Sequence, residues 1–250
     1  EVHRGVIVDG HATGPGKLEA YFYPPSSVAR DAKLRMGFKP GVTKADVQNA
    51  LLKFGIDDSM YALMNEYPVT PMTGWTIPEG VAHSTAAYVT FEIQVPQDAY
   101  NAATWKFGQR LEGEERAKAY NSKALKGLAD EKAFVNELID WELSSSQSLK
   151  EKFHTTPTII DEGSWGKRYQ VFYNSFYGEG WEVRPGCSLT LPAIPEPIGG
   201  VVWAGLGSIN GNDIAHGAIN EFLATPNTPL EVKNPGTELL VIYTFQSLRN

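Results

Sequence analysis

Short strand-like runs that end at Gly or Pro occupy most of this sequence, and they restrict the folds open to it. The runs are rich in β-branched and aromatic residues, as strands are. Helical stretches do not alternate with them in β-α-β order, so a parallel α/β sheet is disfavoured and an antiparallel barrel or double-sheet jelly roll is favoured. Examples are KLEAYFYP, AKLRMGFKP and AAYVTFEIQV early in the chain, and WEVRPGCSLTLPA, GGVVWAGLGSING and TELLVIYTFQ late in it.

The strand-like runs fall into two zones, and the segment between them has a different amino-acid composition. Residues 1–108 and 157–250 are strand-like, whereas residues 109–156 are rich in charge and in helix formers. A chain of 250 residues is long enough for one large core or two small ones. The sequence therefore predicts a mainly β protein of two small barrels, joined by a helical segment that serves as an insertion, linker or lid.

One amphipathic helix is expected inside the first zone, in GVTKADVQNALLKFG (residues 41–55). Thr43 can cap its start, and Asp46 three residues later completes a capping box. Gly55 is placed to end it. The apolar residues at helical spacing are Val47, Ala50, Leu51 and Phe54. In the middle zone, Phe134, Leu138 and Trp141 share one face of a second expected helix.

The composition favours a small-molecule ligand. A net charge of −7 and a pI near 5.3, with no block of Lys or Arg, disfavour nucleic acid and anionic membranes as partners. No run of about 18 apolar residues is present, and the opening EVHRGVIVDG lacks the pattern of a signal peptide. The single cysteine, Cys187, cannot form an intramolecular disulfide. A cytoplasmic protein is expected, with its oligomeric state open.

Residues 74–84, GWTIPEGVAHS, are the first candidate for a functional element. Pro78 and Gly80 suit a tight turn after a strand, because Pro presets φ and Gly accepts a positive φ. His83 follows at the start of the next expected strand, where an imidazole would lie at the mouth of a barrel. Histidine in that position is a candidate metal ligand, or a hydrogen-bonded side chain with no further role.

Candidate partners for His83 lie upstream, in DGHATGPGKLEAYFY (residues 9–23). Side chains that point into a small barrel converge, so Asp9, His11 and Glu19 would complete a set of two imidazoles and one or two carboxylates. Such a set suits a divalent first-row ion with positions left open for substrate. The alternatives are a turn histidine for His11 and an exposed strand glutamate for Glu19. The other histidines, His3, His154 and His216, show no ligand spacing.

Three segments carry a resemblance to a known family: GFKPGVTKADVQNAL (37–51), the stretch 68–83 that ends in GWTIPEGVAH, and FEIQVPQDA (91–99). In order and approximate spacing they resemble the first cupin domain of class I mannose-6-phosphate isomerases. The resemblance implies a bicupin, that is, two cupin-type barrels or jelly rolls. It also implies an aldose–ketose isomerase that acts on a small sugar or sugar phosphate.

The resemblance also implies roles for individual residues. His11, Glu19 of a K-x-E motif and His83 would bind a divalent metal ion, with zinc expected first and iron, manganese or nickel as the other ions. Asp9 stands where the family has glutamine. Lys17 would be a catalytic residue that moves or orients protons; its alternative is a surface lysine on a strand edge.

Two parts of the chain depart from the family. Its arginine-bearing segment is replaced by YNAATWKFGQR, which leaves Arg110 as the candidate contact to a substrate phosphate. Residues 157–250 are similar to a second cupin unit, but Glu231 or its neighbours stand where the motif has histidine, so no metal is expected there. These departures keep two alternatives open: a carbohydrate-binding or regulatory cupin without catalysis, and a non-haem iron oxygenase, which two histidines and a carboxylate also suit.

Overall fold

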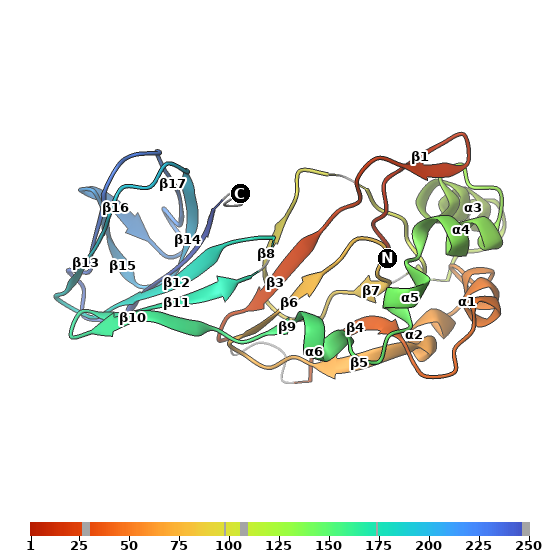
Figure 1. Ribbon diagram of the computed structural model, residues 1–250, viewed down its shortest axis with the longest axis horizontal. Coiled ribbons are helices and arrows are strands. Elements are labelled where there is room, and N and C mark those ends of the chain that lie inside the picture. The colour runs from red at the N-terminus through yellow and green to blue at the C-terminus, as the bar shows by residue number, and fades with distance from the viewer. Residues whose placement is uncertain (27–30, 98, 106–109, 174, 247–250) are drawn as a thin grey trace. The chain divides into compact units, whose positions relative to one another are not determined.

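Antiparallel β-strands form most of the structure, a computed structural model that describes residues 1–250 apart from 27–30, 98, 106–109, 174 and 247–250 (Figure 1). The mainly β prediction is confirmed. The chain divides into two units, one of Glu1–Pro71 with Trp75–His154 and the other of Met72–Gly74 with Thr155–Asn250. The boundary expected at residues 108 and 109 lies outside the described residues.

The strands of the first unit form two sheets and a separate two-stranded ribbon. The sheet orders are β8-β3-β6-β9 and β5-β4-β7, and the ribbon is β1-β2. The bounds are β1 (Val6–Val8), β2 (His11–Thr13), β3 (Glu19–Tyr23), β4 (Lys33–Phe38), β5 (Met64–Pro68), β6 (Thr73–Ile77), β7 (His83–Ser84), β8 (Phe91–Gln94) and β9 (His154–Thr155).

An apolar core is shared by the two sheets of the first unit. On β4, Leu34 and Met36 are fully buried, whereas the alternating residues Lys33 and Arg35 point outward, as the two-residue period of a strand requires. Tyr21 of β3 and Trp75 of β6 meet them in the same core. The interior between the two sheets is therefore filled largely by aromatic and aliphatic side chains.

Helices pack against one end of these sheets. The predicted capping box is confirmed: the Thr43 hydroxyl accepts from the Asp46 backbone N–H, and the Asp46 carboxylate accepts from the Thr43 N–H at 2.8 Å. The bounds are α1 (Lys44–Leu51), α2 (Ser59–Leu63), α3 (Gly113–Ala119), a π-helical turn η1 (Tyr120–Leu125), α4 (Glu131–Leu138), α5 (Trp141–Ser144) and α6 (Leu149–Phe153).

The described residues of the helical zone, up to His154, belong to the first unit. Phe134 and Leu138 of α4 are fully buried in one cluster with Val2 and Val47, and the Trp141 ring stacks on Phe38 at 5.3 Å. The apolar face of the segment therefore completes a second core, and its charged residues face outward. None of the helices in the described parts of the chain has the length and apolarity needed to span a membrane.

The second unit is a pair of sheets around its own core. The orders are β10-β11-β12-β19-β14-β17 and β13-β18-β15-β16. Trp181, Val202 and Ile242 from the first sheet pack against Leu189 and Val232 from the other. The bounds are β10 (Thr158–Gly163), β11 (Gly166–Phe172), β12 (Gly178–Val183), β13 (Ser188–Leu191), β14 (Ile198–Ala204), β15 (Leu206–Ile209), β16 (Asn212–Ala215), β17 (Glu221–Ala224), β18 (Leu230–Lys233) and β19 (Leu240–Gln246).

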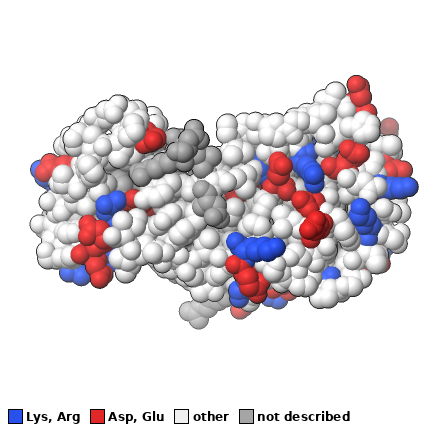
Figure 2. Space-filling model, in the orientation of Figure 1, with Lys and Arg blue, Asp and Glu red and all other residues white. Residues whose placement is uncertain are grey.

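Charged side chains of both signs are interspersed on the visible surface of each unit. Figure 2 shows basic groups standing next to acidic ones on this face. Independently of that view, the Glu66 carboxylate on β5 accepts from Lys33 and from Arg35, each at 2.8 Å. These pairs lie on the outer side of the β4 sheet, away from the core.

Candidate metal centre

The turn expected in residues 74–84 is present and delivers His83 to the interior. Gly80 adopts a positive φ of 74°, and the Val81 N–H donates to the Pro78 carbonyl at 3.3 Å. His83 then opens β7, directly opposite the buried Met36 of β4. Cross-strand partners share a face of the sheet, so the imidazole is directed inward and is 1% exposed.

The strand expected to run on from His83 is interrupted instead. β7 pairs with β4 in one sheet, whereas β8, which begins at Phe91, pairs with β3 in the other. The chain must cross between sheets at this point, so residues 85–90 do not belong to a strand. The interruption leaves His83 at the end of one sheet and places β8 beside Glu19 of the other.

Glu19 begins β3 and is 1% exposed. Its carboxylate is contacted from both sides along the same strand face. Lys17 pairs with Oε1, and the Tyr21 hydroxyl donates to Oε2 at 2.7 Å. Lys17 also donates to the Gln94 side chain at 3.2 Å across the β3–β8 pair.

His3 is the third buried group at this place. Val2 and Asn101 exchange backbone hydrogen bonds of 3.0 Å, which hold the first residues in an extended conformation. Side chains two residues apart then share a face, so His3 and Glu1 turn toward the same side and Val2 enters the core. His3 is 2% exposed.

The two imidazoles converge on the Glu19 carboxylate. The His3 Nε2 atom lies 3.4 Å from Oε1, and the His83 Nε2 atom lies 3.3 Å from Oε2. The ring centroids are 5.1 Å apart. Neither Nε2 atom has a hydrogen-bond partner although both are buried.

The backbone around each imidazole assigns its tautomer. The Nδ1 atom of His3 lies 2.5 Å from the Ala99 carbonyl oxygen, and that of His83 lies 2.9 Å from the Val81 carbonyl oxygen. A carbonyl oxygen only accepts, so each Nδ1 carries a proton, and in the neutral imidazole each Nε2 presents its lone pair. Two lone pairs thus face a carboxylate, an arrangement that a cation between them would stabilise. Histidines that bind metals are oriented in this way by the hydrogen bond of their other nitrogen.

Burial and neighbouring charges keep His3 and Glu19 in the protonation states that a metal requires. Burial, assisted by the neighbouring His83, lowers the pKa of His3 from 6.5 to about 4, so His3 is neutral near pH 7. Burial by itself would raise the pKa of Glu19, but contacts with His83, His3 and Lys17 outweigh it and lower that pKa. Burial and the nearby Glu19 carboxylate raise the pKa of Tyr21, which stays a hydrogen donor.

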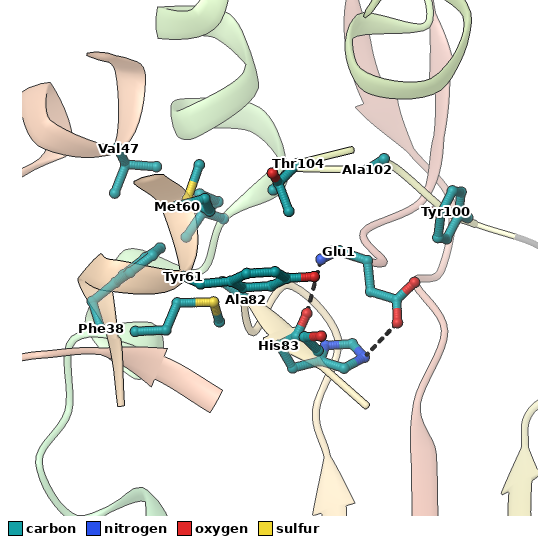
Figure 3. Close-up of a pocket in the computed structure, with 14 residues that line it drawn as sticks. Glu1, Phe38, Val47, Met60, Tyr61, Ala82, His83, Tyr100, Ala102 and Thr104 are labelled. Atoms are coloured by element: carbon teal, nitrogen blue, oxygen red, sulfur yellow. Dashed lines mark hydrogen bonds and ion pairs between the residues drawn. The ribbon is translucent and has the colours of Figure 1, made fainter. Parts of the chain in front are cut away.

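Glu1 supplies a further carboxylate on the open side of the cluster. Its Oε1 atom lies 3.8 Å from the His83 Nε2 atom, and Figure 3 shows the two side chains turned toward each other. One ligand atom from each of Glu1, His3 and His83 lies within 4.8 Å of the other two. Among the residues that the structure describes, Glu1, His3 and His83 are the His, Cys, Asp and Glu side chains whose ligand atoms lie close enough together to bind a metal ion.

A small chamber adjoins His83 and Glu1 (Figure 3). Its volume of about 30 Å³ is enough for one or two water molecules. The Tyr61 ring from α2 forms part of its wall, and the Arg35 guanidinium lies over the ring at 4.5 Å from its centroid. Most of the remaining wall is apolar, with Phe38, Val47, Met60, Met64 and Ile139 among its residues.

The structure brings together three of the residues singled out in the sequence: Lys17, Glu19 and His83. Two others lie elsewhere. Asp9 and Gly10 form the exposed two-residue turn of the β1–β2 hairpin, with Asp9 at a φ of 51°. His11 follows that turn, is 72% exposed, and has its Nδ1 atom 3.4 Å from a carboxylate oxygen of Glu137.

The remaining candidates of the sequence also lie outside the cluster. Arg110 is 68% exposed, with its Nε atom 3.7 Å from a carboxylate oxygen of Glu112. Glu231, in the second unit, is exposed on β18 and accepts from Lys233 at 2.8 Å. Neither residue contacts the groups around Glu19.

His3 is the ligand candidate that the sequence interpretation missed. The pattern acid-x-His occurs twice, at Glu1–His3 and at Asp9–His11, and the resemblance to the isomerases implies the second copy. A signal in favour of the first copy was available: Asp9-Gly10 is a typical hairpin turn pair, which places His11 on an exposed ribbon.

Comparisons with known proteins show similarity in structure only. No family profile and no curated protein sequence matches the chain. A proposed mannosephosphate isomerase from Archaeoglobus fulgidus is similar in structure, with 13% identity, a TM-score of 0.62, and coverage of 99% of this chain and 67% of the other. Mannose 6-phosphate isomerase from Bacillus subtilis has 13% identity, a TM-score of 0.56 and coverage of 99% and 70%. An oxalate decarboxylase has 14% identity, a TM-score of 0.50 and coverage of 99% and 65%.

Similarity at this level of identity shows the fold. The chain therefore has a cupin-type fold, in agreement with the expectation from its motifs. Fold alone does not specify an activity, because one scaffold supports many reactions.

Proposed function

We propose that this chain binds a divalent metal ion through His3, Glu19 and His83 and isomerises a small sugar or sugar phosphate. The observation that carries the proposal is the pair of buried, unpartnered Nε2 atoms that face the Glu19 carboxylate. Two nitrogens and a carboxylate oxygen form a donor set suited to zinc, and to iron, manganese or nickel. The two fold relatives named as mannose phosphate isomerases support a sugar as the substrate class.

The residues of the cluster would have different roles in such a reaction. A bound divalent ion would supply a Lewis acid that polarises the oxygen of an open-chain sugar. Isomerisation also needs a group that moves a proton between adjacent carbons. The Glu1 carboxylate, on the wall of the chamber, is placed to do so. Lys17 is engaged by Glu19 and Gln94, so it orients the carboxylate ligand.

Metal content is the direct test of the site. Wild-type protein, purified without a histidine tag, is compared with His3→Ala, His83→Ala and His11→Ala by elemental mass spectrometry. We expect about one equivalent of metal in wild type and in His11→Ala, and its loss in the other two variants, because only His3 and His83 are buried beside Glu19. Metal that is retained in His3→Ala and lost in His11→Ala would contradict the assignment.

Turnover tests the second half of the proposal. Metal-loaded protein is assayed for aldose-to-ketose conversion with free and phosphorylated hexoses and pentoses. Conversion that disappears in His83→Ala is the expected result. A metal-loaded protein that converts none of these sugars would exclude the isomerase and leave the metal centre in place.

The chamber favours a second candidate, a non-haem iron oxygenase. Two imidazoles and one carboxylate suit iron(II) with open positions, and a mainly apolar space of about 30 Å³ is suited to a very small ligand. A hexose would require Tyr61 to move away from His83. Oxygen uptake by the iron-loaded protein in the presence of a reducing co-substrate, and none by the zinc-loaded protein, would favour this candidate over the isomerase.

A further inference from the structure

Tyr21 is the buried polar residue of the cluster that the proposed function leaves without a role. We propose that Tyr21 is a positioning residue that sets the metal affinity of the site by holding the carboxylate of Glu19. The inference rests on the proposed function, since it concerns the same ligands. Its basis is the hydrogen bond of 2.7 Å from the Tyr21 hydroxyl to Oε2 of Glu19.

Strand geometry makes this contact a fixed one. Glu19 and Tyr21 are two residues apart on β3, so both side chains leave the same face of the strand. Tyr21 is 1% exposed and is packed with Met36 and Trp75 in the core between the sheets. Its ring also meets the edge of His83, with centroids 6.4 Å apart. The hydroxyl is therefore held where it is and is shielded from exchange with bulk water.

The carboxylate is held on both of its oxygens. Lys17 pairs with Oε1 and Tyr21 donates to Oε2, which opposes rotation of the carboxylate. Each oxygen has more than one lone pair, so both remain able to face the imidazoles at 3.4 and 3.3 Å. Tyr21 thus contributes to the site through Glu19, and its hydroxyl points at the carboxylate.

The loss of a hydrogen-bond partner of a metal ligand weakens metal binding by a typical factor. Removal of a group that hydrogen-bonds a metal ligand typically lowers metal affinity by about 10- to 100-fold. Tyr21→Phe keeps the ring in the core and removes only the donor. We therefore expect the variant to fold and to bind metal more weakly.

Tyr23 provides a matched control on the same strand face. It is fully buried, its hydroxyl has no hydrogen-bond partner, and its ring meets Tyr88 at 5.8 Å. Tyr23→Phe removes a hydroxyl from the same core and leaves the contacts of Glu19 intact. A general effect of losing a buried hydroxyl on β3 would therefore be seen in both variants, and a positioning role only in Tyr21→Phe.

The experiment measures zinc affinity of the full chain by competition with a chromophoric chelator. Wild type, Tyr21→Phe, Tyr23→Phe, Glu19→Ala and the double variant Tyr21→Phe/Glu19→Ala are compared after removal of bound metal. The absorption spectrum of the cobalt-loaded proteins reports the ligand environment as a second readout. If Tyr21→Phe unfolds, Tyr21→Met repeats the test with a flexible side chain that also lacks a donor.

We expect affinity about 10- to 100-fold lower in Tyr21→Phe, a change within about twofold in Tyr23→Phe, and no further loss when Tyr21→Phe is added to Glu19→Ala. Equal losses in Tyr21→Phe and Tyr23→Phe would overturn the inference, as would a full additional loss in the double variant. A wild type that binds no zinc would overturn both proposals. A wild type that binds zinc as tightly as Tyr21→Phe would overturn this one alone.

Discussion

Each unit of this protein buries one glutamate on a strand, and the two glutamates differ in what surrounds them. Glu19 is 1% exposed on β3, and Glu179 is 2% exposed on β12. Both accept from side chains two residues away on the same strand face. For Glu179 these are the Tyr177 hydroxyl at 2.6 Å and the Trp181 indole N–H at 2.7 Å.

The difference lies in the group that faces the remaining carboxylate lone pairs. Arg168 of β11 donates to Glu179 from Nε at 2.9 Å and from Nη2 at 2.8 Å, a bidentate pair that neutralises the carboxylate within the chain. Glu19 instead faces the lone pairs of two imidazoles. Burial of a carboxylate therefore does not by itself make a binding site. Glu179 is neutralised by a bidentate arginine, whereas Glu19, besides its contacts with Lys17 and Tyr21, faces two imidazoles with which it could share a metal ion.

Of the changes that test this difference between the two glutamates, removal of Arg168 should have the largest effect on stability. Arg168→Met leaves Glu179 buried without its counter-charge, and we expect unfolding free energy to fall by about 3–5 kcal/mol. Urea denaturation measures the loss. The control is Lys167→Gln, since Lys167 forms an exposed pair with Glu182 at 3.2 Å and such pairs contribute at most about 1 kcal/mol. Equal losses in the two variants would show that Arg168 is an ordinary surface cation.

Zinc should stabilise the first unit, which contains Glu19, and not the second, which contains Glu179. A ligand present at 100 times its dissociation constant stabilises the state that binds it by about 2.7 kcal/mol. We expect zinc to slow amide hydrogen exchange in β3 and β7, next to Glu19 and His83, and to leave β11 and β12 unchanged. His83→Ala should abolish the effect. Slower exchange around Glu179 in this variant would mean that zinc acts at another site.

Mild acid should destabilise the first unit more than the second. The pKa of His3 is lowered by burial from 6.5 to about 4, so between these values the unfolded state binds more protons than the folded state. Stability of the metal-free protein then decreases as pH falls from about 6.5 to about 4, by up to about 1.4 kcal/mol per pH unit. His3 makes no pH-dependent contribution above that window. The groups that face it are Glu1, Lys17, Glu19 and His83.

Glu179 should respond only at lower pH. Burial alone would raise its pKa, but the hydrogen bonds from Arg168, Tyr177 and Trp181 outweigh burial and lower it below the ordinary 4.5. Its contribution is present above that value and is lost as pH falls further. Amide protection factors, which correct for the intrinsic exchange rate at each pH, should therefore fall between pH 6.5 and 5 in the first unit of wild type and less in that of His3→Gln. A parallel fall in wild type and the variant would rule out His3 as the cause.

Local patterns in the sequence were sufficient for several elements of the fold. The capping box of Thr43 and Asp46, the turn at Pro78 and Gly80, and the alternation of β4 all depend on neighbouring residues. The helical zone was predicted as helical for the same reason. Its place in the first unit could not be predicted, because the burial of Phe134 depends on apolar residues far away in the chain.

The sequence by itself determined the mainly β character and the cap at Thr43, because short-range periodicity and turn chemistry encode them, and its resemblance to a known family indicated two members of the candidate site, Glu19 and His83. Only the tertiary structure decided between His3 and His11. Both follow an acid by two residues, and the Asp9-Gly10 turn pair is a local signal that indicates an exposed ribbon for His11 but does not indicate a buried position for His3. The pairing of Val2 with Asn101 and the contact of His3 with the Ala99 carbonyl are long-range interactions, and they direct one imidazole inward while a hairpin leaves the other in solvent.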